Sequence, residues 1–469
     1  MCNIFHRIIL LFAFGCFASS GWAQFSTDRA TRTPIFRSAA DSISFSRTRA
    51  RIDSLKQYRE IPQHYWDSLN AKFDELYKTA ILDYRISYVP DLRLPNLDSI
   101  TGDFHEITAV SISGPKKRLP ESLFKCTNVT MVELVNTSIK RLPRKLQQLK
   151  NLEILEIYHN ESGGHLRLRQ NKTVKQLVIS SKTPEQLPRR YSAFASLEHL
   201  DLSQNNLTHF PNGARKNKRL KELTLKNNRL TLEGKIKYHP HVEKLSLQYN
   251  NIERVPASIA NFPNLIRLSL NYNKITDVDT AIVQLQKLEA LSFYKNNLSR
   301  IPTPLYYLSS LKGIDLFYNE IESLDSTLSY WKNLEVLYLN HNKLIFLPQN
   351  IDKLSRLDAL FLAHNRIDRL PLSIGNLRKL KVLKVSHNYL RTLPPSLLDL
   401  SDMEDLDIAS NYLSDIDPRY FDFKQFKIFS LGNNPWSTET KRILLTKVPE
   451  LRKRNVFVHV LGENESLDD

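Results

Sequence analysis

Apolar residues recur along the chain in one fixed pattern between residues 107 and 426. The pattern reads LxxLxL, with Leu, Ile, Val or a similar residue at the first, fourth and sixth positions, and it returns every 22 or 23 residues. Such a period is typical of a repeat array, in which each repeat packs only against its neighbours. Fifteen copies begin at Ile107, Val129, Leu152, Val174, Leu197, Leu220, Val242, Leu265, Leu288, Leu311, Leu334, Leu357, Leu380, Met403 and Phe426.

The spacing inside each copy predicts a short β-strand. The fourth and sixth positions are two residues apart, so on a strand both side chains point to the same face. Leu337 and Leu339 therefore point inward, and the residues between them point outward. One such strand cannot bury its apolar side alone, and stacking on the next repeat produces a continuous core. The stretch LPLSIGNLRKL returns the chain along the outer side, where its Pro favours short turns.

An Asn follows the sixth position by three residues in most repeats. Its amide both donates and accepts hydrogen bonds, so a stack of Asn can satisfy backbone groups where the strands end. Pro115, Thr137 and Lys182 replace it, all in the first four repeats, which predicts an irregular beginning of the array. The ladder Asn are Asn160, Asn205, Asn228, Asn250, Asn273, Asn296, Asn319, Asn342, Asn365, Asn388, Asn411 and Asn434.

The phrase LxxLxLxxNxL, often continued by xxLP, resembles the leucine-rich repeat family over about two thirds of the chain. This resemblance implies an α/β fold class, namely a solenoid with a curved parallel β-sheet on its concave face and short helices or turns on its convex face. Because an array exposes its apolar core at both ends, we also expect caps there, with a helical cap at the N-terminal end. NNPWSTETKRILLTKVPELRKRNVFVHV resembles the helix-plus-strand C-terminal cap of this family.

The sequence predicts four segments. Residues 1–23 read as a signal peptide, residues 24–100 as a basic arm with a capping helix, residues 101–435 as the repeat array and residues 436–469 as the C-terminal cap with an acidic tail. The capping helix is expected because apolar residues recur at helical spacing. These residues are Trp66, Leu69, Phe73, Leu76, Tyr77 and Ala80.

The signal peptide predicts export to the periplasm, the cell surface or the medium. Its apolar run, residues 8–17, is too short to span a bilayer, and small residues precede the boundary after Ala23. A buried helix is the alternative interpretation of this run. Cys16, in the phrase Phe14-Gly15-Cys16, offers a second alternative, a lipoprotein cleavage site. Cleavage after Ala23 leaves Cys126, which we interpret as a small core residue.

Motifs of catalysis are missing from the sequence. It contains no Gly-rich phosphate loop, no HExxH, no paired CxxC and no nucleophile elbow. We therefore predict a protein that is not an enzyme, with no catalytic residue, no cofactor and no metal.

Outward-facing strand positions carry the strongest functional signal. They are the third, fifth and seventh residues of each repeat, together with the eighth, just before the ladder Asn. Clustered aromatic residues are enriched at protein contacts, so we predict a surface that binds a protein or peptide partner. The alternative is a filler role in which the rings only pack sideways, and a metal at the three His lacks an obvious fourth ligand. The candidate residues are Tyr249, Tyr272, Tyr294, Phe317, Tyr318, Tyr338, His341, Phe361, His364 and His387.

Charge narrows the choice of partner. The net charge is +17, yet the concave positions hold five cations and seven acids. Nucleic-acid binding in the concave groove is not predicted, because it requires a basic groove. A cell-envelope structural or adhesive protein, attached through basic edges to an anionic polymer or membrane surface, is the alternative function. The oligomeric state and glycosylation of the seven sequons stay open. The concave acids are Glu133, Glu156, Asp201, Glu222, Asp315, Asp405 and Asp407, and the cations are Lys226, Lys244, Arg267, Lys295 and Lys384.

Overall fold

The computed structural model describes residues 31–36, 81–87 and 96–460, except residues 101, 162 and 182. The signal peptide, Cys16, the predicted capping helix and the acidic tail lie outside these residues. The chain forms two compact units, unit one (Met1–Asn206 and Lys216–Thr224) and unit two (Leu207–Arg215 and Leu225–Asp469). Within the predicted arm, strands β1 (Thr31–Phe36) and β2 (Ile81–Ser87) pair antiparallel, a pairing that the sequence did not predict.

Parallel strands at the predicted LxxLxL positions form the sheet of unit one. Each strand pairs with the strand of the next repeat, and equivalent repeat positions lie opposite each other, as Glu133 lies opposite Glu156. The first four strands have five residues and the last two have three. They are β3 (Ala109–Ser113), β4 (Met131–Val135), β5 (Ile154–Tyr158), β6 (Gln176–Ser180), β7 (His199–Asp201) and β8 (Glu222–Thr224).

Unit two repeats this arrangement with strands of three residues. Equivalent positions again lie opposite each other, as Leu337 lies opposite Leu360. The strands are β9 (Lys244–Ser246), β11 (Arg267–Ser269), β13 (Ala290–Ser292), β14 (Gly313–Asp315), β15 (Val336–Tyr338), β16 (Ala359–Phe361), β17 (Val382–Lys384), β18 (Asp405–Asp407), β19 (Ile428–Ser430) and β20 (Phe457–His459). A separate parallel pair joins β10 (Arg254–Val255) and β12 (Asp277–Val278).

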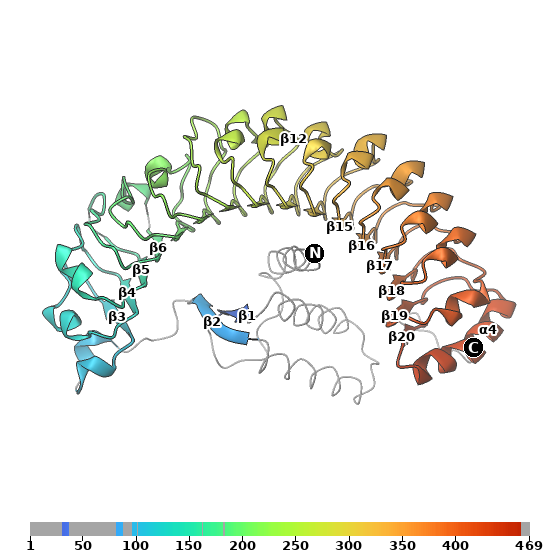
Figure 1. Cartoon of the computed structure of the whole chain (residues 1–469), viewed down its shortest axis with the longest axis horizontal. Coiled ribbons are helices and arrows are strands. Elements are labelled where there is room, and N and C mark those ends of the chain that lie inside the picture. The colour runs from blue at the N-terminus through green and yellow to red at the C-terminus, as the bar shows by residue number, and fades with distance from the viewer. Residues whose placement is uncertain are drawn as a thin grey trace. The chain divides into compact units, whose positions relative to one another are not determined.

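Short 3-10 helices return the chain between strands. In each unit the strands follow the inner side of the ribbon and the 3-10 helices follow the outer side (Figure 1). Many begin after a Pro, as at Pro348, whose carbonyl accepts the N–H of Ile351 at 3.1 Å. They are η2 (Leu97–Ser99), η3 (Phe104–Glu106), η4 (Glu121–Lys125), η5 (Arg144–Gln148), η6 (Pro184–Gln186), η7 (Asn212–Ala214), η8 (Ala257–Asn261), η9 (Thr280–Gln284), η10 (Thr303–Tyr307), η11 (Ser326–Tyr330), η12 (Gln349–Lys353), η13 (Leu372–Asn376), η14 (Pro395–Asp399) and η15 (Pro418–Asp422).

The core lies between the strands and these outer turns. Leu337 and Leu339, predicted to point inward, are 1% and 0% exposed. Burying a Leu side chain contributes roughly 1.5–3 kcal/mol, and the contribution recurs in every repeat. Cys126 is also buried, as expected for a small core residue.

The predicted Asn ladder is confirmed. In a typical repeat, the Nδ2 group of Asn342 donates to the carbonyl oxygens of Leu316 at 2.9 Å and Leu339 at 3.1 Å. Its Oδ1 accepts the N–H of Ile321 at 3.0 Å. One side chain thus satisfies backbone groups of three different segments, as the sequence predicted.

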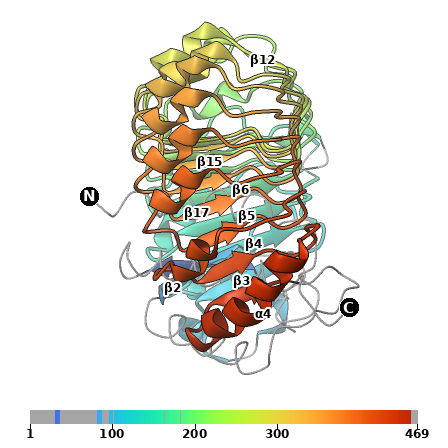
Figure 2. The same cartoon turned by 90° about the vertical axis from the view of Figure 1, so that its right-hand side faces the viewer.

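A helix followed by a strand ends the array, in agreement with the sequence. Helix α4 (Thr438–Lys453) begins at Ser437, whose hydroxyl accepts the N–H of Thr440 at 3.2 Å. The helix buries Leu444, Val448 and Leu451, which recur at helical spacing. Strand β20 then pairs with β19, and Figure 2 shows α4 beside the column of 3-10 helices of the last repeats. Among the described residues, no helix is long and apolar enough to cross a membrane.

Candidate functional site

The ten aromatic and histidine residues predicted as a binding surface all belong to unit two. We call this set the aromatic stripe. Tyr338 and Phe361 end strands β15 and β16, whereas each of the other eight residues lies two or three residues after the end of a strand. The structure places them on the concave face, because they occupy the fifth, seventh and eighth positions of consecutive repeats.

The eighth position of the repeat adopts a left-handed backbone conformation. Such a conformation costs a residue other than Gly roughly 1–2 kcal/mol. In each repeat this cost is offset in part by a hydrogen bond to the next repeat, as from the N–H of His364 to the carbonyl of Ser386 at 3.0 Å. The φ angles are 55° at Tyr249, 54° at Tyr272, 54° at Lys295, 53° at Tyr318, 51° at His341, 56° at His364 and 52° at His387.

Identical backbone geometry makes successive rings stack. Repeats in a parallel sheet are about 4.8 Å apart, which is close to the separation of stacked rings. Tyr318 and His341 have ring centroids 4.2 Å apart, and His341 and His364 have centroids 4.0 Å apart. His387 continues the stack at 4.0 Å from His364, with planes inclined by only 9°. At the other end of the stripe, Tyr249 stacks on Tyr272 at 4.2 Å.

Tyr294 joins these two stacks through edge contacts. The eighth position of its repeat is Lys295, whose ammonium lies 5.2 Å from the ring centroid of Tyr272. Tyr294, at the seventh position, contacts Tyr272 at 5.1 Å and Tyr318 at 5.7 Å between ring centroids. Ring contacts therefore continue without a break from Tyr249 to His387.

Three further rings of the stripe extend it sideways. Phe317 stacks on Tyr318 at 4.6 Å and on His341 at 5.1 Å. Tyr338 and Phe361, at the fifth position of neighbouring repeats, stack at 4.5 Å with planes inclined by 12°. The stripe is thus more than one ring wide near strands β14 to β16.

Exposure differs along the stripe. Tyr318, His364 and His387 are exposed, and most other members are half-buried. Tyr294 is only 8% exposed, so the expectation that the stripe tyrosines face solvent is wrong at this residue. The sequence placed it on the concave face, but neighbouring rings cover it. Tyr294 supports the surface, and the exposed rings present it.

Burial lowers the pKa of the central histidines. Loss of solvent, followed by the charges of His341 and His387, lowers the pKa of His364 to about 4. Burial and the charge of His387 also lower the pKa of His341. At neutral pH these two imidazoles are therefore uncharged, which allows them to stack closely. Parallel stacked rings do not converge on one point, and within the described part of the chain no cluster of three or more His, Cys, Asp or Glu could hold a metal.

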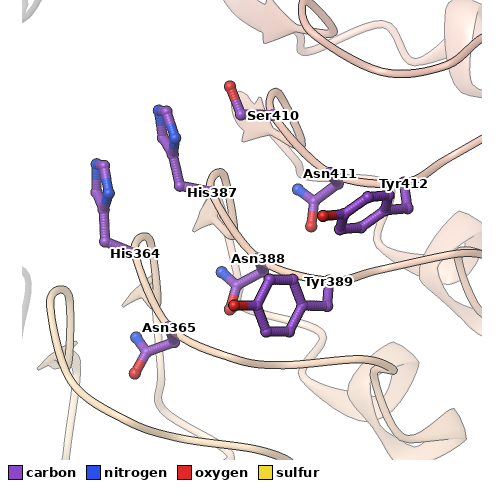
Figure 3. Close-up of a pocket in the computed structure, with 8 residues that line it drawn as sticks. All are labelled: His364, Asn365, His387, Asn388, Tyr389, Ser410, Asn411 and Tyr412. Atoms are coloured by element: carbon purple, nitrogen blue, oxygen red, sulfur yellow. The ribbon is translucent and has the colours of Figure 1, made fainter.

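A shallow hollow of about 520 Å³ borders the end of the stripe. His364, His387 and Ser410 stand in a row on one side, and Tyr389 and Tyr412 form the other side (Figure 3). Ladder Asn side chains lie at its base. The two tyrosines are 49% and 57% exposed, and their ring centroids are 5.9 Å apart. Neither tyrosine is among the residues predicted from the sequence, although the phrase Asn-Tyr-Leu recurs at 388–390 and 411–413.

The sequence matches the leucine rich repeat family model at residues 240–298 and 309–367, and a second leucine rich repeat model at residues 196–216. These matches coincide with the repeats whose strands, 3-10 helices and Asn ladder the structure shows. The chain is a leucine-rich repeat protein.

Solved structures share this leucine-rich repeat fold. A leucine-rich repeat protein of Leptospira interrogans has a TM-score of 0.59 and 24% identity, over 77% of this chain and 97% of that one. The ectodomain of a membrane receptor kinase of Arabidopsis thaliana, in complex with Casparian strip integrity factor 2, has a TM-score of 0.51 and 24% identity, over 76% of this chain and 46% of that one.

The third structure is the Toll–Spatzle complex of Drosophila, with a TM-score of 0.57 and 16% identity, over 76% of this chain and 55% of that one. No curated protein matches the leucine-rich repeat chain by sequence. At these identities the structural likeness concerns the fold alone.

Proposed function

We propose that this leucine-rich repeat protein is a non-catalytic scaffold that binds a protein or peptide partner through the aromatic stripe. The observation that carries the proposal is the unbroken series of ring contacts from Tyr249 to His387 on one face of unit two. All ten predicted residues contribute to this face.

Stacked rings are well suited to binding. Each Tyr or Phe offers a large contact area with two rotatable side-chain bonds, so little conformational entropy is lost when a partner covers it. Contact with neighbouring rings restrains them further before the partner arrives. The exposed hydroxyl of Tyr318 and the exposed imidazoles of His364 and His387 add hydrogen-bonding groups at the rim.

Structures of the same fold support this type of function. The Arabidopsis ectodomain was solved in complex with Casparian strip integrity factor 2, and Toll was solved in complex with Spatzle. A leucine-rich repeat sheet is therefore compatible with binding another polypeptide. The identity of the partner of this chain does not follow from that likeness.

A pull-down with the full-length chain tests the proposal. The variant Tyr318→Ser/His364→Ser removes two exposed members of the stripe and should lose the partner. The matched control is Tyr307→Ser/Tyr330→Ser, which removes two tyrosines of similar exposure, 49% and 48%, from η10 and η11 on the outer side. Equal partner recovery by both variants would contradict a binding role of the stripe.

Attachment to an envelope polymer or membrane surface through basic edges remains the alternative, and it has weaker support. Several edge lysines lie in ion pairs with acids of the neighbouring repeat, such as Lys175 with Glu153 at 2.6 Å and Lys343 with Glu320 at 3.1 Å. Their charge is thus partly compensated. Release of the protein from envelope material by salt, with the stripe variant retained equally, would favour this alternative.

We also propose that the protein is exported. This proposal rests on residues 1–23 of the sequence, and the cysteine at position 16 gives the lipoprotein alternative. Sequencing of the mature N-terminus separates the two cases. A mature chain that still begins at Met1 would contradict both.

A further inference from the structure

The concave positions of strands β3 to β8 in unit one are acidic. They hold Glu133, Glu156, Asp201 and Glu222, and no Lys or Arg belongs to any of these strands. The whole chain nevertheless contains 66 Lys and Arg against 49 Asp and Glu. Such a group of acids in so basic a protein is a local feature that the fold itself does not require.

Glu133 and Glu156 are the buried centre of this surface. They lie opposite each other on the paired strands β4 and β5, where neighbouring strands are about 4.8 Å apart. Their side chains are only 3% and 1% exposed. The Oε2 atom of Glu156 accepts the hydroxyl of Tyr158 at 2.8 Å. The Oε1 atom of Glu133 is buried and has no hydrogen-bond partner.

An unpartnered carboxylate oxygen in this position indicates a missing donor. A buried acceptor without a partner loses its hydration and gains nothing in exchange, which is unfavourable, and more so for a charged group. Polar groups buried in native proteins are therefore nearly always satisfied by a side chain, a water or a ligand. At Glu133 the missing donor has to satisfy an oxygen that lies beside a second carboxylate.

The electrostatics of the pair call for a cation. Burial raises the pKa of Glu156 to about 7, and the charges of Glu133 and Asp201 add to this effect, whereas the Tyr158 hydrogen bond opposes it. Burial also raises the pKa of Glu133, opposed by a hydrogen bond from Ser111. Near neutral pH Glu156 is therefore protonated in a substantial fraction of the molecules. A cationic ligand would supply positive charge in place of this proton.

Apolar side chains next to the carboxylates define the shape of such a ligand. Val178 lies opposite Glu156 on β6, and Ile154 precedes Glu156 by two residues on the same face of β5. Both are half-buried. A long side chain with an aliphatic stem and a charged head can pack along these residues and still reach the carboxylates.

We propose that Glu133 and Glu156 form a binding site for the guanidinium group of an arginine side chain carried by a protein or peptide. Guanidinium is planar, presents five N–H donors and is more weakly hydrated than ammonium, so it is suited to two neighbouring, buried carboxylates. The site lies in unit one and is separate from the aromatic stripe, and its test does not depend on the stripe.

Labelled pentapeptides and the full-length chain test the site. The probe is Gly-Ala-Arg-Ala-Gly, and the control peptide carries citrulline, which keeps the shape of arginine but loses its charge. Fluorescence anisotropy should show at least about tenfold weaker binding of the citrulline peptide, because loss of one partner of a buried charge pair leaves the other charge unpaired. A competition experiment with spermidine distinguishes recognition of arginine from a general attraction of cations. Equal binding of both peptides, or competition by spermidine as strong as by the arginine peptide, would overturn the proposal.

Variants assign the binding to the two carboxylates. Glu133→Gln and Glu156→Gln preserve the shape of each side chain and should weaken binding of the arginine peptide about tenfold or more. The matched control is Glu153→Gln, which removes the same charge from an exposed residue that pairs with Lys175 at 2.6 Å and directly precedes strand β5. It should change binding less than about twofold. Equal losses in all three variants would show an effect of net charge alone and overturn the proposal.

Proton release distinguishes a ligand site from a structural pair that merely shares a proton. Calorimetry at pH 7 in two buffers of different ionisation enthalpy should detect protons released when the arginine peptide binds, and none for Glu156→Gln. The groups that face Glu156 are Glu133 on β4, Tyr158 on β5 and Asp201 on β7, with Ser111 on β3 next to Glu133. Absence of peptide binding, together with a raised melting temperature of Glu156→Gln, would identify a purely structural pair and overturn the proposal.

The chain's own basic arm provides one more decisive comparison. If the wild type does not bind the peptide but the variant Arg47→Ser/Arg49→Ser/Arg51→Ser does, the arm competes for the site. That result would overturn an external arginine as the occupant. Binding of equal strength in both proteins supports the proposal.

Discussion

The two units build their concave faces from the same repeat but give them opposite chemistry. Unit two presents stacked rings, and on this face Lys384 forms an ion pair with Asp405 at 2.5 Å. Unit one presents Glu133, Glu156, Asp201 and Glu222, with no Lys or Arg in strands β3 to β8. The inward positions of the repeat determine the fold, whereas its outward positions are free to differ. One repeat fold thus carries two distinct sets of side chains at equivalent outward positions.

The backbone that stacks the rings in unit two is also present in unit one. Asn136 and His159 of unit one have φ angles of 53° and 51°, close to those of His341 and His387 in unit two. The geometry of the turn thus recurs, but a stack forms only where consecutive repeats supply rings. Whether a surface is aromatic or acidic is therefore decided by side chains at a few positions, and substitutions there test the comparison directly.

The largest effect is expected from a charge placed in the core. Leu339→Asp introduces a carboxylate at a residue that is 0% exposed and has no partner for it. We expect a loss of more than about 4 kcal/mol of unfolding free energy. Ile157→Asp, at the same repeat position of unit one and 1% exposed, is the matched variant. Hydrogen exchange should show the loss of protection in the repeats around each site, and an unchanged melting curve would contradict the strand register.

Substitutions of buried and of exposed members of the stripe should differ in how much they lower the free energy of unfolding. Tyr294→Ser removes a ring that is 8% exposed and should cost about 3 kcal/mol, as other large aromatic truncations do. Tyr318→Ser removes a ring that is 42% exposed and should cost less than about 1 kcal/mol. Denaturant unfolding measures both. Similar costs would mean that the whole stripe packs as a filler. A destabilised variant that still binds its partner would favour binding through the basic edges.

Loss of a ladder side chain in unit two should lower the free energy of unfolding about as much as loss of Tyr294. The equivalent substitution in unit one should lower it less. Asn342→Ala leaves the N–H of Ile321 and the carbonyls of Leu316 and Leu339 without this partner, and should cost about 2–3 kcal/mol. At the equivalent position of unit one, Thr137 donates a single hydrogen bond to Asn160 at 2.8 Å. Thr137→Ala should therefore cost only about 1 kcal/mol by thermal unfolding. Equal losses of unfolding free energy in the two variants would show that Thr137 stabilises its irregular repeat as much as a ladder Asn stabilises a regular one.

Much of the fold was predictable because the determining residues are periodic. Leu337 and Leu339 specify the strand, Pro348 the turn and Asn342 the ladder, and each recurs at equivalent positions of other repeats. The ring contacts of the stripe were not predictable, because they depend on the left-handed turn that aims successive side chains in one direction.

Non-periodic features were also missed. Tyr294 is buried because the rings of Tyr272, Phe317 and Tyr318 contact it, and these contacts are not visible in the sequence. The pair Glu133 and Glu156 was visible only as charge, since its burial and its unpartnered oxygen are properties of the folded chain.

The smallest effect expected is a pH dependence of opposite sign in the two units. The pKa of Glu156 in unit one is raised to about 7, so the folded state binds more protons than the unfolded state between its ordinary pKa and pH 7. Stability of this unit should therefore fall as the pH rises through that window. The pKa of His364 in unit two is lowered to about 4, so there the unfolded state binds more protons between pH 4 and the ordinary pKa of 6.5. Stability of this unit should rise with pH in that window.

Hydrogen exchange between pH 5 and pH 7 can follow both units in one sample, once the rates are corrected for the intrinsic effect of pH. Lowering the pH should increase protection around β5 and decrease it around β16 and β17. Glu156→Gln should abolish the first change without affecting the second, and His364→Gln should do the reverse. His364 is exposed, so solvent screening should make its effect the smaller of the two. Changes of the same sign in both units would show that a common charge effect, rather than these two side chains, controls the response to pH.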